Sequence, residues 1–160
     1  MRDKTCFFTG HRAIAAADIP MVRRALSCAV MDMINRGVLD FIAGGAVGFD
    51  MLAADTVAEL KCEYEGLRLI LYIPCVGHDR RWKNEDKESL ERLILTADEV
   101  HYISETYDHE CMMRRNAAMV RDAYYCLAWY NKSCRGGTAK TVSMAKKTGC
   151  CIRNLAIEPW

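Results

Sequence analysis

Short apolar runs alternate with amphipathic helical segments along almost the whole chain, and this alternation restricts the fold more than any other feature. Runs of strand length are expected at residues 5–9, 38–43, 67–73, 99–103, 123–130 and 150–157. Six strands that alternate with five helical segments are typical of βαβ units, whose right-handed crossovers cover both faces of a sheet. The sequence therefore predicts a single α/β domain over residues 1–160, with a doubly wound, mostly parallel sheet and helices on both faces.

The boundaries of the expected elements rest on proline, glycine and capping residues. Asp18 is expected to cap the first helix, and Gly37 ends it. The third strand is a continuous apolar run that Pro74 is expected to stop, which suits a strand buried on both faces. Asn84 is expected to cap the third helix. The remaining helices are expected at residues 51–60, 109–121 and 138–148.

The charge balance and the hydropathy exclude several classes of protein. The 160 residues contain 22 Lys and Arg against 21 Asp and Glu, which gives a formal net charge of +1. This balance argues against a strongly basic nucleic-acid binder, although a local basic patch stays open. No apolar run reaches the roughly 18 residues of a membrane span, and residues 1–8 do not resemble the start of a secretory signal. No membrane span is therefore expected.

The chain contains nine cysteines, and no two of them form a C-x-x-C pair. Because zinc sites usually contain such close pairs, no metal site is predicted. Most of the cysteines fall in apolar segments, where a reduced thiol packs as a small hydrophobic group. This usage indicates a reduced, cytoplasmic protein. Cys75 and Cys134 are expected in loops, and these positions leave a reactive role open.

Two glycine-rich loops are the strongest functional signal in the residues themselves. In a parallel sheet every strand-to-helix loop lies at the carboxyl edge, where ligands bind. The loops 44–50 and 136–138 each open a helix there, and glycine lets a phosphate approach the amide groups of a helix start. The alternative is a plain tight turn in which Asp50 only caps its helix. Thr138 likewise either caps its helix or donates its hydroxyl to a phosphate.

Side chains from other loops are expected to join this edge. Arg12 follows the first strand, and Arg115 and Asn116 lie early on the helix after the fourth strand. Arginine recognises phosphate in a planar, bidentate way. His11 is a candidate for base stacking or acid–base work, with a structural role in its turn as the alternative. Trp82 is a candidate lid that stacks on a base, or else a plug over the core.

Four motifs in a fixed order give the chain a family resemblance. They are Gly10-His11-Arg12, the stretch 43–50 with its three glycines, Arg115-Asn116, and Gly136-Gly137-Thr138. In this order they resemble the SLOG superfamily, its YpsA-like branch above all, and they are similar to the Rossmann-like core of the DprA/Smf family. The resemblance implies a Rossmann-like domain that binds a nucleotide or an ADP-ribose-like ligand. The ligand-binding positions that it implies, with the neighbours His11 and Phe49, are Gly10, His11, Arg12, Gly44, Gly45, Gly48, Phe49, Asp50, Arg115, Asn116, Gly136, Gly137 and Thr138.

The resemblance leaves the chemistry open. The related LOG phosphoribohydrolases carry a catalytic glutamate where Thr141 stands in this sequence. Hydrolysis of a glycosidic bond needs a carboxylate that activates water or stabilises the charge developing on the sugar, and the candidates for an acid–base group are Asp50, Glu105 and His11.

We therefore expect binding or sensing of a small-molecule nucleotide without strong catalysis. One alternative is cleavage of the base–ribose bond of a nucleoside monophosphate. A second alternative is DprA-like binding of single-stranded DNA, which the net charge of +1 supports little. Assembly into a homo-oligomer is left open, and no cofactor other than the nucleotide is assigned.

Overall fold

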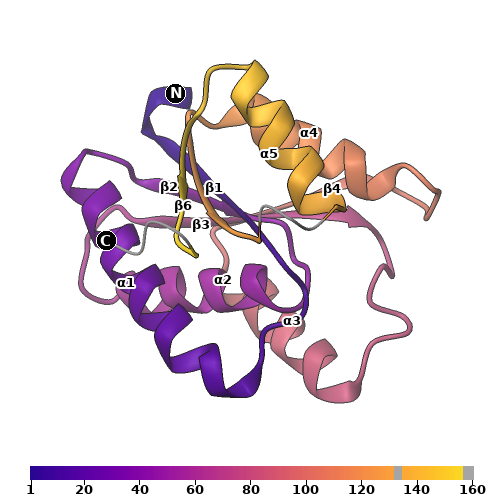
Figure 1. The fold of residues 1–160 in the computed structure, drawn as a ribbon. Coiled ribbons are helices and arrows are strands. Elements are labelled where there is room, and N and C mark those ends of the chain that lie inside the picture. The colour runs from indigo at the N-terminus through magenta and orange to yellow at the C-terminus, as the bar shows by residue number, and fades with distance from the viewer. Residues whose placement is uncertain (132–134, 157–160) are drawn as a thin grey trace.

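The computed structural model describes residues 1–131 and 135–156, and it contains one six-stranded sheet (Figure 1). The strand order is β4-β3-β2-β1-β5-β6, and every neighbouring pair is parallel. This arrangement confirms the predicted α/β class with a parallel sheet. The strands are β1 (Thr5–Gly10), β2 (Asp40–Ala43), β3 (Arg68–Cys75), β4 (Glu99–Ser104), β5 (Tyr125–Trp129) and β6 (Cys151–Asn154).

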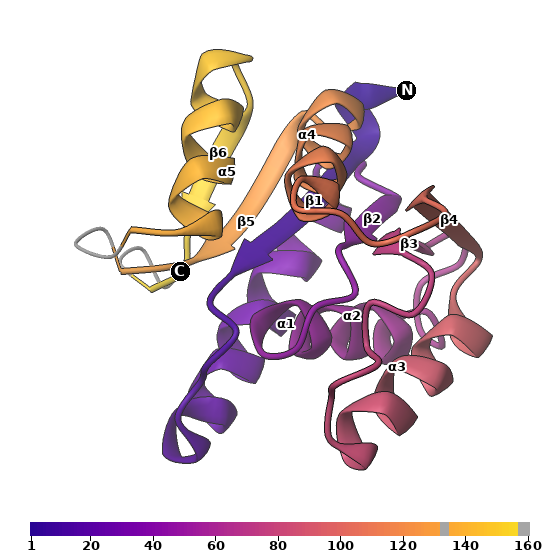
Figure 2. The same cartoon turned by 90° about the vertical axis from the view of Figure 1, so that its right-hand side faces the viewer.

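Helices cover both faces of the sheet, as predicted. The helices α1, α2 and α3 lie on one face and α4 and α5 on the other (Figures 1 and 2). None of the helices in the described part of the chain is long and apolar enough to cross a membrane. Their bounds are α1 (Ile19–Asn35), α2 (Phe49–Leu60), α3 (Asn84–Thr96), α4 (Cys111–Asp122) and α5 (Gly137–Lys147), with short 3₁₀ turns at Arg2–Lys4 and Ala16–Asp18.

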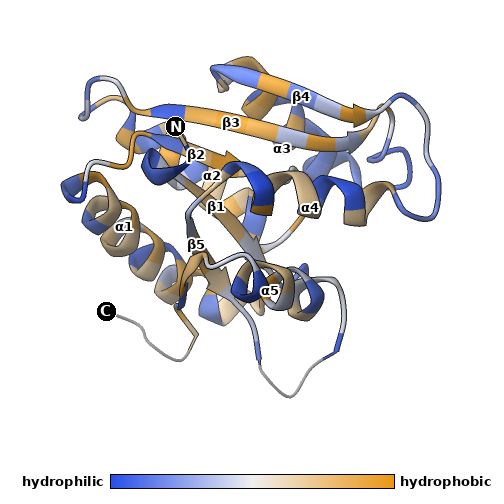
Figure 3. Cartoon of the chain, turned by 90° about the horizontal axis from the view of Figure 1, so that it is seen from above, coloured by the Kyte–Doolittle hydropathy of each residue, from blue (hydrophilic) through white to orange (hydrophobic). Residues whose placement is uncertain are grey.

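The central strands divide the core into two layers, one on each side of the sheet. Phe8 of β1 belongs to the layer under α1–α3, whereas its neighbour Phe7 belongs to the layer under α4 and α5. Both side chains are completely buried, as a strand covered on both faces requires. Figure 3 shows the matching hydropathy pattern: β3 is mostly apolar along its length, as expected for a strand covered on both faces. The edge strand β4 alternates between apolar and polar residues.

Three local expectations are wrong. Asn84 does not cap α3, because Lys83 occupies the cap position and Asn84 is the first helical residue. Pro74 does not stop β3, which continues to Cys75. The pairing of β3 with β2 ends at Leu71, so the strand has one free side at the proline, where a missing N–H costs no ladder hydrogen bond. Cys75 is therefore a buried strand residue and not a loop residue, while Cys134 lies outside the described residues.

The connections place the candidate site at the carboxyl ends of the central strands. From β1 the chain proceeds outward through β2, β3 and β4, and it then returns to add β5 on the other side of β1. The strand order therefore reverses between β1 and β5. In open α/β sheets the loops on the two sides of this reversal diverge, and they leave a crevice outside the strand ends.

Candidate functional site

A pocket of about 360 Å³ occupies this crevice. Its walls come from four stretches that are far apart in the sequence: the end of β1, the β2–α2 loop, the first turns of α4 and the start of α5. Its size falls in the range of small-molecule sites. The described residues that line it are Thr9, Gly10, His11, Arg12, Ala46, Asp50, Met112, Met113, Arg115, Asn116, Met119, Gly137 and Thr138.

The first glycine loop holds a carboxylate in the wall of this pocket. Gly48 occupies the cap position of α2, so Asp50 lies inside the helix, and the interpretation of Asp50 as a mere cap is wrong. Asp50 is only 6% exposed, and the backbone of Ala46 and Gly44 favours the charged form of its carboxylate. The backbone of this loop therefore interacts electrostatically with a carboxylate of the protein itself.

Burial sets the ionisation of Asp50. Loss of solvent raises its pKa from 3.8 to about 6, and the positive charge of Arg115, the loop backbone and the more distant Arg12 oppose this rise. The carboxyl group is thus ionised at neutral pH. Its proton is lost at a pH about two units higher than that of a solvent-exposed aspartate. Perturbed carboxyl groups of this kind often mark functional sites.

Arg115 is the buried cation of the pocket. It is 5% exposed, and burial lowers its pKa, an effect that the charge of Asp50 opposes. Its Nε donates to the Oδ1 atom of Asn116 at 2.7 Å, and its Nη1 donates to the carbonyl oxygen of Gly44. The bond to Gly44 ties α4 to the β2–α2 loop, and the two hydrogen bonds together fix the guanidinium plane.

Gly44 has to be a glycine because both charged groups pack against it. A Cβ atom added there would lie 2.7 Å from Arg115 Nη1 and 2.7 Å from Asp50 Oδ2. The missing side chain therefore lets a carboxylate and a guanidinium approach the same backbone position. Gly44 itself is buried and contributes no surface to the pocket.

His11 joins the two sides of the crevice. Its Nε2 accepts a hydrogen bond of 2.8 Å from the backbone N–H of Asn131, and its carbonyl oxygen accepts one of 3.1 Å from the N–H of Phe49. The structural role that the sequence left open is thus present, while the half-buried ring also lines the pocket. Arg12, the next residue, is exposed at the pocket rim.

The start of α5 forms the opposite wall. Gly136 occupies the cap position, and Gly137 and Thr138 are the first two helical residues, so Thr138 does not cap the helix. The amide groups of such a first turn have no partner within the helix. Thr141, which stands where the LOG enzymes carry their glutamate, donates its hydroxyl to the carbonyl oxygen of Gly137 at 2.8 Å.

Several expected site residues lie away from the pocket surface. Phe49 is completely buried, with its ring 6.4 Å from those of both Phe8 and Trp129. Trp82 is partly buried against the core beside His78, at a ring distance of 5.0 Å. Glu105 is exposed in the β4–α4 loop. The described lining of the pocket does not include these three residues. It also lacks four of the expected glycines: Gly44, Gly45, Gly48 and Gly136.

The methionines of α4 form a part of the site that sequence reasoning did not assign. Met112, Met113 and Met119 line the pocket beside Arg115 and Asn116. The signal was the helical spacing, which brings positions 112, 115, 116 and 119 to one side of the helix.

The thiols and acidic residues outside the pocket form no metal-binding cluster in the part of the chain that the structure describes. No cluster of three or more His, Cys, Asp or Glu side chains able to hold a metal ion occurs there. Cys75 and Cys111 are both buried, and the pKa of the Cys75 thiol is raised, first by burial and then by its neighbour Cys111. A raised pKa disfavours the reactive thiolate.

Comparison with known proteins decides the family. The YpsA model, which describes the YspA SLOG family, matches residues 7–151. The chain belongs to this SLOG family. The matched residues include every stretch that lines the pocket, so the pocket is a feature of the SLOG portion of the chain.

Two similar curated proteins come from Bacillus. A UPF0398 protein of Bacillus cereus (strain B4264) is 26% identical over 133 residues, which cover 82% of this chain and 72% of the relative. A UPF0398 protein of Bacillus thuringiensis (strain Al Hakam) has the same identity and coverage. This SLOG chain therefore has bacterial homologues.

A solved structure shares the fold. The X-ray structure of DNA processing protein A (DprA) from Streptococcus pneumoniae superposes with a TM-score of 0.65 at 16% sequence identity, over 94% of this chain. The matched part is 49% of the DprA chain, so the present SLOG chain spans about half the length of that protein. At this identity the likeness shows a common architecture.

Proposed function

We propose that this chain binds a nucleotide or a nucleotide-derived ligand in the pocket between α4 and α5. The observation that carries the proposal is the assembly of one pocket from the start of α5, Arg12 after β1, and Arg115 on α4. The amide groups of a helix start and an exposed guanidinium such as that of Arg12 are the usual partners of phosphate, and Arg115 adds a buried positive charge to the same pocket. The SLOG membership of the chain supports the same ligand class.

The phosphate belongs at the start of α5 and not at the first glycine loop. At the first loop, the Asp50 carboxylate lies against Gly44, and its negative charge repels an anion. At α5 the pocket is lined by Gly137 and Thr138, with Arg12 at the same rim. The positive end of the helix dipole adds to this attraction.

The remaining pocket wall suits an aromatic base. Met112, Met113 and Met119 supply polarizable, apolar side chains, and thioether sulfurs make favourable contacts with aromatic rings. Methionine adapts to different ring shapes because its side chain is unbranched. This wall therefore predicts contact with a base without fixing which base is bound.

A thermal-shift series tests this proposal. The purified chain is heated with inorganic phosphate, adenosine, the four common ribonucleoside monophosphates, NAD and ADP-ribose. We expect phosphorylated nucleosides to raise the melting temperature, because a ligand at 100 times its Kd stabilises the fold by about 2.7 kcal/mol. For a chain of this size that gain corresponds to roughly 5–10 °C.

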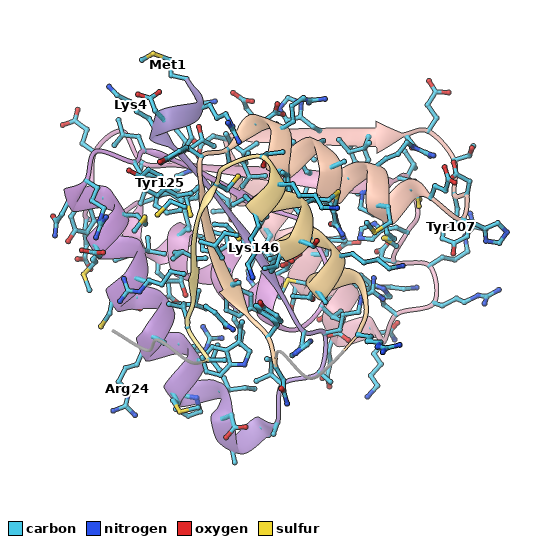
Figure 4. All side chains as sticks on the ribbon, turned by 45° about the horizontal axis from the view of Figure 1, so that its top comes forward. Met1, Lys4, Arg24, Tyr107, Tyr125 and Lys146 are labelled. Carbon is cyan, nitrogen blue, oxygen red and sulfur yellow. The ribbon has the colours of Figure 1, made fainter. Side chains whose placement is uncertain are left out.

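Two arginine variants provide the matched comparison. Arg12→Ala removes an exposed cation at the pocket rim, and we expect affinity for the phosphorylated ligands to fall by at least about tenfold. Arg24→Ala removes an exposed cation from α1, which lies on the face of the sheet opposite α4 and α5 (Figure 4), and should leave affinity unchanged. No stabilisation by any phosphorylated ligand at millimolar concentration, or equal effects of the two variants, would contradict the proposal.

Asp50 favours one second candidate, cleavage of the base–ribose bond. It is the carboxylate among the described pocket-lining residues, and its pKa of about 6 suits acid–base work near neutral pH. Chromatography of the same nucleotide samples after long incubation separates the two functions. Release of free base by the natural chain, and its loss in Asp50→Asn, would establish the enzyme, whereas intact nucleotides support binding alone.

A further inference from the structure

The pocket contains two buried charged groups with opposite hydrogen-bonding demands. The Asp50 carboxylate, when ionised, can only accept hydrogen bonds, and the Arg115 guanidinium can only donate them. Both line the same pocket and both contact the space beside Gly44. Each lies 2.7 Å from the point that a Cβ of Gly44 would occupy, so they are no more than twice that distance apart. Yet the two groups do not form a direct ion pair, since no oxygen of Asp50 lies within 4.0 Å of an Arg115 nitrogen among the described atoms.

Arg115 keeps donors available for a ligand. Within the described part of the chain, its Nε is bonded to Asn116 and its Nη1 to Gly44, which leaves the second N–H of Nη1 and the two N–H groups of Nη2. Asn116 lines the pocket as well, and its Nδ2 has the sulfur of Met113 as a partner at 4.0 Å, a weak acceptor. The pocket wall beside Asp50 therefore offers one strong acceptor and several donors.

A hydroxyl group meets both demands, because it donates one hydrogen bond and accepts others. A phosphate does not, since it brings only acceptor oxygens and negative charge to an ionised carboxylate. We propose that Asp50 and Arg115 bind the ribose hydroxyls of the ligand, and that the pocket thereby selects ribonucleotides over deoxyribonucleotides. This inference rests on the proposed nucleotide function and adds to it a residue pair that reads the sugar.

The arrangement explains why a carboxylate is kept next to an anion-binding helix start. Asp50 weakens the attraction of the pocket for phosphate, which a site built for phosphate alone would avoid. A site with buried polar groups rejects a ligand that leaves them without a partner, and this is how enzymes discriminate strongly on a single hydroxyl. The carboxylate thus lowers the affinity of the pocket for anions in general and raises its selectivity for a sugar that carries hydroxyl groups.

Matched nucleotide pairs test the inference by calorimetry. The pairs are AMP with 2′-deoxy-AMP and 3′-deoxy-AMP, and GMP, CMP and UMP each with its 2′-deoxy form. Within a pair the base and the phosphate are identical, so the difference in Kd isolates one hydroxyl. We expect removal of a hydroxyl to weaken binding at least about tenfold in every pair that binds.

The variant Asp50→Asn locates the effect. It should reduce the ribose preference to less than about threefold, and affinity for 2′-deoxy-AMP should not fall, because the carboxylate that weakens the attraction for phosphate is gone. The control Arg24→Ala should keep the full preference. If the variant does not fold, the ligand pairs on the natural chain alone decide the question.

The outcomes separate this inference from the proposed function. Equal affinities for ribonucleotides and both deoxy forms would overturn the sugar assignment and leave nucleotide binding intact. A preference for ribose that persists unchanged in folded Asp50→Asn would overturn the role of Asp50. Absence of binding by all the nucleotides would instead remove the proposed function itself.

Discussion

Gly48→Ala is expected to destabilise the chain by about 4 kcal/mol or more, and so to lower its melting temperature by roughly 8–16 °C. Gly48 caps α2 with a φ of 81°, a conformation that side chains with a Cβ rarely adopt. An added Cβ would also press on the Arg12 carbonyl group, and would lie 2.6 Å from the carbonyl oxygen of His11. Both contacts are with backbone atoms, so relief requires movement of the β1–α1 connection. Urea denaturation of the two proteins measures the loss.

Gly66→Ala is the matched control for this prediction. Gly66 has the same φ of 81°, but an added Cβ there meets nothing within 4 Å. The control therefore carries the cost of a positive φ without a steric contact, about 1–2 kcal/mol. Equal losses of stability in the two variants would show that the close approach of the β1 and β2 loops is absent.

The pH dependence of folding is expected to report the buried carboxyl group of Asp50. Its pKa is about 6 in the folded chain and 3.8 when exposed, so between these values the folded state binds more protons than the unfolded state. Stability from this group is therefore greatest below pH 4, and it is lost as the pH rises to about 6. The loss amounts to about 3 kcal/mol, after which the contribution stays constant.

Asp50→Asn removes this titration, and a comparison of the two proteins isolates it. Other groups titrate nearby: burial lowers the pKa of His78 and raises that of Asp55. These groups are common to both proteins and cancel in the difference. The difference in unfolding free energy between variant and natural chain should grow in favour of the variant from pH 4 to pH 6. Parallel curves over this interval would mean that Asp50 is not buried as a charged group.

The fold was predictable because its signals are local and repeated. Each central strand, such as β1 with its buried Phe7 and Phe8, is a short apolar run bounded by polar residues or glycine. Parallel pairing then follows from the helices between the strands, since crossovers of that length are right-handed. The same logic placed the two glycine loops at one edge, so Arg12 and Thr138 were expected together before their contacts were known.

The sequence did not predict which of the two glycine loops is free to bind phosphate or which side chains face the pocket, because both depend on contacts between distant segments. The sequence pattern is similar in both glycine loops, yet one of them packs against the Asp50 carboxylate. Trp82 packs against His78, and this contact depends on how the loop between β3 and α3 folds back on itself. The local sequence pattern does not contain this information. Pro74 misled for a similar reason, since the end of its neighbouring strand makes the proline harmless.

The central claim is that the start of α5 and the residues after β1 bind one anionic ligand together. Amide NMR of the ¹⁵N-labelled chain, titrated with the tightest-binding nucleotide, tests it most directly. We expect the signals of Gly137, Thr138 and Arg12 to shift together with a single Kd, while that of Arg24 on α1 stays in place. A saturating titration that moves signals of the α1–α3 face and leaves these three unchanged would contradict the account.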